Sequence, residues 1–124
     1  MKWFKPLATH EHDEIQRTSK ELEIAASRLI EAFNQGNIVT LSAKTCELID
    51  NFDCEISRSW WLTLCLLMRK RWKDVLYSLW VGEMEAPIIL EQHGKSFPYL
   101  ISGNTRLCVC RVLGIQIRAW WIKI

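Results

Sequence analysis

The residues with the clearest capacity for chemistry form the run Ser102-Gly103-Asn104-Thr105-Arg106. The apolar residues before it, 97–101, are typical of a strand, and the residues after it, 107–113, are typical of a short helix. A glycine at a strand-to-helix turn lets the backbone approach a ligand closely, and the first amides of a helix have no intrahelical partners. This arrangement favours a phosphate group, to which Arg106 would add a charge-assisted hydrogen bond. The alternative is a tight turn in which Arg106 makes a surface ion pair.

Two other groups of residues have side chains that bind metal ions in proteins. His10, His12, Asp13 and Glu14 lie together near the start of the chain. Disorder concentrates near chain ends, so we expect solvated residues there and no metal site. The second group is the five cysteines, which lack zinc-finger spacing: Cys46, Cys54, Cys65, Cys108 and Cys110. Their odd number, without an apolar signal peptide, predicts reduced, buried thiols in a cytoplasmic protein.

Composition indicates one globular domain. The chain has 124 residues, of which 49% are hydrophobic and 24% charged, and this length supports a core without disulfide or metal staples. The net charge of +2 gives no general reason to expect nucleic-acid binding. The most apolar run, Ser59–Met68, is shorter than the roughly 20 residues that a transmembrane helix needs, so we expect no membrane span. The basic run Arg69–Lys73 would suit an interfacial helix, but a core helix with a solvated basic turn is favoured.

The elements in the first half of the chain are predicted from periodicity. Apolar residues at three- and four-residue spacing predict a helix over 13–33, with a capping box at 18–21 partway along and a stop at 34–37. Residues 38–41 suit a short strand. Ser42 is placed to cap a helix that runs to about Asn51.

A tryptophan-rich helix is predicted from Ser57 or Ser59 to Val81, with Gly82 at its C-terminal end. Its apolar stripe should be buried: Trp61, Leu64, Met68, Trp72, Leu76 and Leu79. Trp60 and Arg69–Arg71 should be more exposed. Beyond Gly82, strands at 87–91 and 97–101 flank a hairpin turn, Gly114 ends the short helix, and 115–124 alternates as a final strand.

This order of elements resembles the ParB/sulfiredoxin-like superfamily. The resemblance is carried by Pro87-Ile88-Ile89-Leu90, by the stretch from Tyr99 to Leu107, and by Arg111-Val112-Leu113-Gly114-Ile115. It is good over 82–124 and extends to 38–124, with 1–37 as a helical extension of a single domain, 1–124. It implies an α+β fold with a small mixed sheet, to which this chain adds the N-terminal and tryptophan-rich helices.

The resemblance also implies a ligand class and a set of contacts. In this superfamily the G-x-x-R turn binds nucleotide phosphates, so Gly103, Asn104, Thr105 and Arg106 would contact a nucleoside triphosphate or diphosphate of the ATP or CTP type. Glu83 and Glu85 precede the first hairpin strand and lie where the family places the nucleotide, which makes them catalytic candidates and ligands for Mg²⁺. The alternative is that both are solvated turn residues.

Departures from the family pattern limit which branch of the superfamily this chain resembles. Sulfiredoxins have a reactive cysteine directly after the glycine, where this chain has Asn104, so we expect no sulfinic acid reductase activity. Partition proteins add a helix-turn-helix domain after this fold. The chain is most similar to small stand-alone ParB-like proteins of bacteria and phages.

Three functions remain open at this stage. The first is nucleotide binding, with or without hydrolysis or phosphoryl transfer. The second is a non-catalytic interaction module that docks a protein partner or a second copy through the tryptophan-rich helix. Its contact residues would be Trp60, Trp61, Trp72 and Trp80. The third is DNA binding or nicking through Arg69–Lys73.

Overall fold

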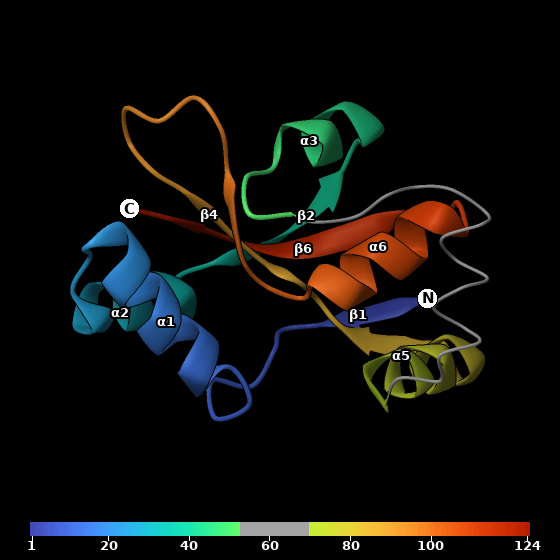
Figure 1. The fold of residues 1–124 in the computed structure, drawn as a ribbon. Coiled ribbons are helices and arrows are strands. Elements are labelled where there is room, and N and C mark those ends of the chain that lie inside the picture. Colours follow the sequence, from blue (N-terminus) through green and yellow to red (C-terminus); the bar gives the residue numbers. More distant parts are fainter. Residues whose placement is uncertain (53–69) are drawn as a thin grey trace.

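The computed structural model describes residues 1–52 and 70–124, which form five helices and six strands (Figure 1). The helices are α1 (His12–Leu22), α2 (Ala26–Asn34), α3 (Ala43–Leu48), α5 (Lys70–Val81) and α6 (Asn104–Val112). The strands are β1 (Lys2–Phe4), β2 (Asn37–Leu41), β3 (Glu83–Glu85), β4 (Ile88–Glu91), β5 (Tyr99–Ser102) and β6 (Ile117–Lys123). The predicted α+β class is confirmed. None of these helices is long and apolar enough to cross a membrane.

The main sheet has four strands in the order β2-β6-β4-β5. It is mixed, as predicted, because β6 pairs antiparallel with β2 and parallel with β4, and β4 forms an antiparallel hairpin with β5. The predicted succession of strand, hairpin, strand, helix and strand in residues 87–124 is therefore confirmed. A second, two-stranded sheet pairs β1 with β3 in parallel, and the sequence patterns did not predict either strand.

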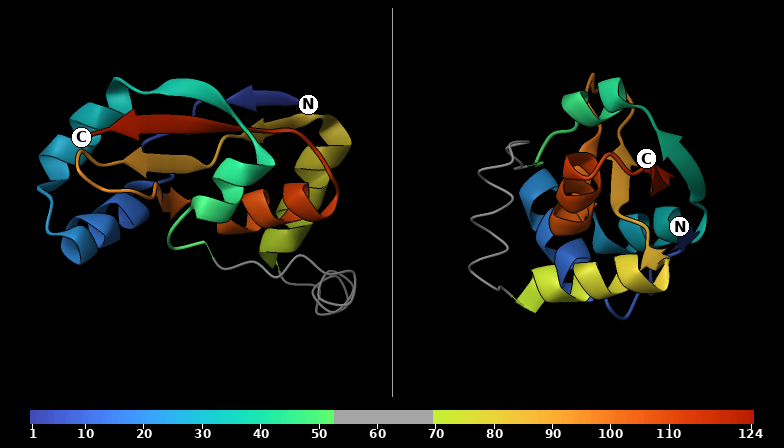
Figure 2. Two further views of the ribbon diagram at one scale, coloured as in Figure 1. Left: turned by 90° about the horizontal axis from the view of Figure 1, so that it is seen from above. Right: turned by 90° about the vertical axis from the view of Figure 1, so that its right-hand side faces the viewer.

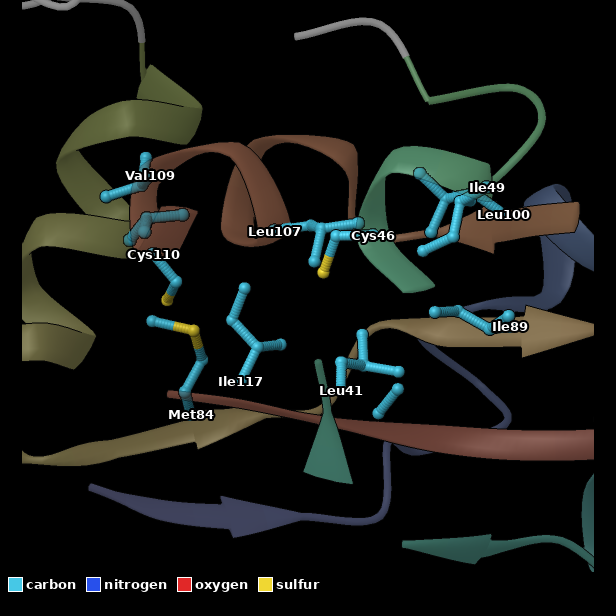
Figure 3. Close-up of a cluster of buried hydrophobic side chains, with 12 residues drawn as sticks. Leu41, Cys46, Ile49, Met84, Ile89, Leu100, Leu107, Val109, Cys110 and Ile117 are labelled. Atoms are coloured by element: carbon cyan, nitrogen blue, oxygen red, sulfur yellow. The ribbon is translucent and has the colours of Figure 1, made fainter. Parts of the chain in front are cut away.

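Helices cover both faces of the main sheet, and its residues alternate between two apolar clusters (Figures 1 and 2). Ile89 belongs to the cluster that includes residues of α3, α5 and α6, whereas its neighbours Ile88 and Leu90 belong to the cluster that includes residues of α1 and α2. Figure 3 shows the first cluster, in which side chains of α3 and α6 meet those of the strands. Leu100 and Leu107 are fully buried there on either side of the turn from β5 to α6, and they anchor that turn.

The predicted single helix over 13–33 is wrong, because the chain forms two helices there. Glu23 has a left-handed backbone conformation (φ 54°) that ends α1. Ser19 lies inside α1 and stabilises the break that follows. Its hydroxyl donates a hydrogen bond to the Ile24 carbonyl, and its own carbonyl accepts one from the Glu23 amide. The predicted capping box therefore does not cap a helix, and α2 begins at Ala26 after an N-cap residue, Ala25, that makes no side-chain cap. The break lets both helices place apolar residues in one cluster.

Smaller differences concern helix lengths and burial. Ser42 caps α3 as predicted, since its Oγ accepts a hydrogen bond from the Thr45 amide at 3.1 Å. α3 nevertheless ends before Asn51, whose backbone is left-handed (φ 61°). In α5, Val75 is buried and Leu79 packs against the core, but Leu76 is exposed, contrary to expectation. The predictions for Trp60, Trp61, Leu64, Met68, Arg69–Arg71 and Trp72 concern side chains outside the described residues.

The described cysteines are buried, but they are not all thiols. Cys46 and Cys110 are free. Burial raises the pKa of the Cys46 thiol, and it raises the pKa of the Cys110 thiol to about 11. Cys108 is disulfide-bonded, so the expectation of reduced thiols is wrong for this residue.

Candidate functional site

The turn between β5 and α6 requires a glycine. Gly103 occupies the N-cap position of α6 with a left-handed backbone (φ 101°). A Cβ atom at this position would lie 2.7 Å from Cβ of Pro87 and 2.9 Å from Nη2 of Arg106, closer than a side chain allows. Both the backbone conformation and the packing therefore exclude other residues. Because α6 begins at Asn104, earlier than predicted, the motif itself forms the first turn of the helix.

The first turn of α6 presents backbone donors. The Leu107 amide donates to the Gly103 carbonyl at 2.9 Å, which starts the hydrogen-bond ladder of the helix. The N-cap residue, Gly103, has no side chain that could cap this helix end. The amides of Thr105 and Arg106 have no hydrogen-bond partner within residues 1–52 and 70–124. Amides of this kind, at the positive end of the helix dipole, attract anions.

The Arg106 side chain is held by carboxylates rather than by solvent, and only 17% of it is exposed. Its Nη2 lies 3.4 Å from Oε1 of Glu11 and donates to Oγ of Ser102 at 3.4 Å. Its Nη1 donates to the carbonyl oxygen of Glu85 at 3.2 Å and lies 3.8 Å from the Glu85 carboxylate. Ser102 in turn donates to Glu11, and His10 lies 3.1 Å from Glu85. We call these five residues the Arg106 network.

The sequence left open whether Arg106 contacts a ligand or makes an ion pair, and the Arg106 network shows ion pairs. Arg106 is in ion pairs, as in the alternative interpretation of the turn, but the pairs are largely inside the protein. The Glu11 side chain is only 7% exposed. The negative charges of two nearby carboxylates offset the attraction between this guanidinium and an incoming anion. Arg106 therefore fixes the turn to α1 and β3.

A cavity of about 470 Å³ opens beside the turn. This volume falls in the range of about 300–1,000 Å³ that is typical of small-molecule sites. The described lining comes from α1, the segment after α3, α5, β5 and the turn: Glu14, Arg17, Asn51, Asp74, Val75 and Leu100–Arg106. Arg17 is paired with Glu14 and lies 3.9 Å from Glu21. The charges of the lining are therefore largely balanced, and its distinctive feature is the helix end.

The structure brings some of the predicted site residues together and separates others. Gly103, Asn104, Thr105 and Arg106 all line the cavity. Glu83 and Glu85 are in strand β3, not in a turn, and neither is among the described lining residues. Glu83 is exposed, and the Glu85 side chain is engaged by His10 and Arg106.

Four polar lining residues, Glu14, Arg17, Asn51 and Asp74, were not predicted as residues of this site. They come from distant parts of the chain, and only tertiary packing brings them to the turn. Asn51 donates from Nδ2 to the Leu100 carbonyl at 2.9 Å, which ties the segment after α3 to β5. The pair Asp50-Asn51 is a turn signal that could have indicated this bend, since both residue types favour turns.

Comparisons of the chain with protein-family models, with curated proteins and with solved structures found no match. The resemblance to ParB/sulfiredoxin-like proteins therefore rests on the motif residues and on the order of elements. Within the described residues, no three His, Cys, Asp or Glu side chains lie close enough to hold a metal ion.

Proposed function

We propose that the chain is a ParB/sulfiredoxin-like protein whose Gly103 turn binds the phosphate groups of a nucleoside triphosphate or diphosphate. The observation that carries this proposal is the start of α6, where Thr105 and Arg106, whose amides have no partner among the described residues, line a cavity of about 470 Å³. In this proposal the amides contact the phosphate, and Arg106 positions them through its ion pairs.

The balance of charges favours a nucleotide bound as its Mg²⁺ complex. A bare triphosphate would meet the carboxylates of Glu14 and Asp74 in the cavity lining. Mg²⁺ commonly binds one or two carboxylates together with phosphate oxygens. These two residues thus replace Glu83 and Glu85 as candidate ligands. If the nucleotide is hydrolysed or donates a phosphoryl group, the same carboxylates are the candidate general bases.

Thermal unfolding in the presence of nucleotides tests the proposal. ATP, ADP, CTP and GTP would each be titrated with and without Mg²⁺. A ligand that binds only the folded protein raises the melting temperature, and the rise grows with the logarithm of its concentration above the dissociation constant. At least one nucleotide should therefore raise it, and more strongly with Mg²⁺. Absence of a shift with every nucleotide would overturn the proposal.

A matched pair of variants at Thr105 separates binding from folding. Thr105→Glu places a negative charge in the first turn of α6, where it interacts favourably with the helix dipole but repels a phosphate. Thr105→Gln has the same size without the charge. We expect both variants to fold with undiminished stability, while nucleotide affinity falls about tenfold or more in Thr105→Glu only, which corresponds to roughly 1.4 kcal/mol. Equal affinity in the two variants would argue against phosphate at this helix end.

A non-catalytic interaction module is the second candidate, and the exposure of α5 favours it. Trp80 is 89% exposed, and Leu76, Tyr77 and Val81 are exposed on the same helix. Aromatic residues of this kind are common in the centres of protein interfaces. If no nucleotide raises the melting temperature and Trp80→Ser abolishes an association seen in sedimentation, this function replaces the first. The DNA-binding alternative depends on Arg69–Lys73, most of which lies outside the described side chains.

A further inference from the structure

The two outer strands of the main sheet differ in how their free edges are covered. Along β5, the Asp50 amide donates to the Pro98 carbonyl at 2.7 Å, and the Leu100 amide donates to the Asp50 carbonyl at 2.9 Å. Within residues 1–52 and 70–124, no segment pairs with the outer edge of β2. In both views of Figure 2, β2 runs along the margin of the molecule. β2 is thus the open edge of the described sheet.

The register of the sheet shows which backbone groups face outward from β2. The Trp120 amide donates to the Pro87 carbonyl at 2.8 Å, away from β2, and Trp120 lies opposite Ile38. A strand residue directs its amide and carbonyl to the same side, so Ile38 and Trp120 are not hydrogen-bonded to each other. The bonds between β2 and β6 come from the alternate residues of β2, including Val39. Ile38 and Thr40 therefore direct their amides and carbonyls outward.

The side chains of β2 include none of the residues that usually prevent an edge strand from pairing with another strand. Natural edge strands are commonly protected by lysine, proline or a bulge. The sequence of β2, Asn-Ile-Val-Thr-Leu, has no charge and no proline, and its pairing with β6 is continuous. Val39, at the centre of the strand, is 38% exposed.

We propose that β2 pairs antiparallel with β2 of a second copy of this chain, about a two-fold axis at Val39. In this register Ile38 of each copy lies opposite Thr40 of the other, and each such pair exchanges two hydrogen bonds through its outward amides and carbonyls. The two Val39 side chains meet in the closer, non-hydrogen-bonded pair between them. The two four-stranded sheets become one continuous sheet.

The symmetry of the strand favours a second copy over an unrelated partner. The outward donors and acceptors, at the residues on either side of Val39, are arranged identically about the centre, as a two-fold interface requires. Identical uncharged strands also meet without repulsion. Because the strand has only five residues, we expect a weak dimer that dissociates when the protein is diluted. This inference is independent of the proposed nucleotide site.

Sedimentation of the full chain over a concentration series tests the dimer. Val39→Lys would place two like charges at the axis, and we expect it to raise the dimer dissociation constant at least tenfold. Val39→Thr keeps a β-branched, uncharged side chain and should change it by less than about threefold. Leu113→Lys adds the same charge at an exposed position on the end of α6 and should have no effect. Circular dichroism would verify that each variant is folded.

Hydrogen exchange reports the proposed bonds directly. In the wild-type dimer the amides of Ile38 and Thr40 should be protected together with those that bond β6. In Val39→Lys, only Ile38 and Thr40 should lose protection. A protein that is monomeric at every concentration, a dimer that survives Val39→Lys, or a dimer that dissociates with Trp80→Ser alone would each overturn the proposal.

Discussion

At the scale of single residues, Arg106 connects segments that are far apart in the sequence. It contacts Glu11 beside α1, Glu85 in β3 and Ser102 at the end of β5. The Glu11 side chain is buried, and Arg106 and Ser102 are its hydrogen-bond partners there. These contacts explain how Arg106 stabilises the fold in the absence of a ligand.

Removal of Arg106 should therefore destabilise the empty protein. Arg106→Ala leaves Glu11 buried with only the Ser102 hydroxyl, and breaking a buried pair in this way costs about 3–5 kcal/mol. Urea denaturation would measure the change. Adding Glu11→Gln should recover part of the loss, because the unpaired charge is gone. A loss below about 0.5 kcal/mol, as at exposed sites, would show that the network does not hold the turn.

Tyr99 provides a second measurement at this scale. Burial, and then the hydrogen bond and charge of Glu21, raise the pKa of Tyr99 to about 12. The protein has two tyrosines, so Tyr77→Phe isolates Tyr99 for titration by tyrosinate absorbance. Because the folded pKa is above the usual value of about 10, stability from this group is complete below pH 10 and falls as pH rises toward 12. Glu21→Gln should lower the pKa, and an unshifted midpoint in Tyr77→Phe would contradict the contact.

At the scale of elements, the break between α1 and α2 depends on a residue that is poorly suited to it. A left-handed conformation costs a residue with a side chain about 1–2 kcal/mol, and Glu23 adopts it. Glu23→Gly should therefore stabilise the protein by about 0.5–1 kcal/mol, after the larger unfolded-state entropy of glycine is subtracted. Lys20→Gly, inside α1, is the control and should destabilise by a similar amount. Chemical denaturation of both variants would test this, and a loss of stability in Glu23→Gly would contradict it.

The elements that sequence predicts well here are those with local signals. Short apolar runs on either side of a glycine-containing turn predict β4 and β5, an alternating run predicts β6, and a capping serine predicts the start of α3. β1 and β3 have three residues each and pair across most of the chain, so no local pattern indicates them. The break at Glu23 has no glycine or proline to mark it. The turn of the candidate site was predictable for the same reason as the strands, whereas Arg17 and Asp74 reach it only through tertiary packing.

At the scale of the whole molecule, the two free thiols among the described residues can show how often the core opens. Cys46 of α3 and Cys110 of α6 belong to one buried cluster. Because burial raises the pKa of both and excludes reagents, we expect alkylation by iodoacetamide at mildly alkaline pH to be at least a hundredfold slower than in urea. Mass spectrometry of the labelled peptides would measure each rate. Rapid labelling of either residue in the native protein would contradict the packing of its helix.

The order of the strands also has a consequence for synthesis. β6 follows the other described strands in the sequence, yet it lies inside the sheet and joins β2 to β4. Until Ile117–Lys123 has left the ribosome, the β4–β5 hairpin can form but β2 has no neighbour. Pairing of Asn37 with Trp121 then closes a loop that spans most of the chain, and such non-local contacts slow folding. During that interval the nascent protein exposes the unpaired β2 and one open edge of β4, which makes it a substrate for chaperones and a target for aggregation.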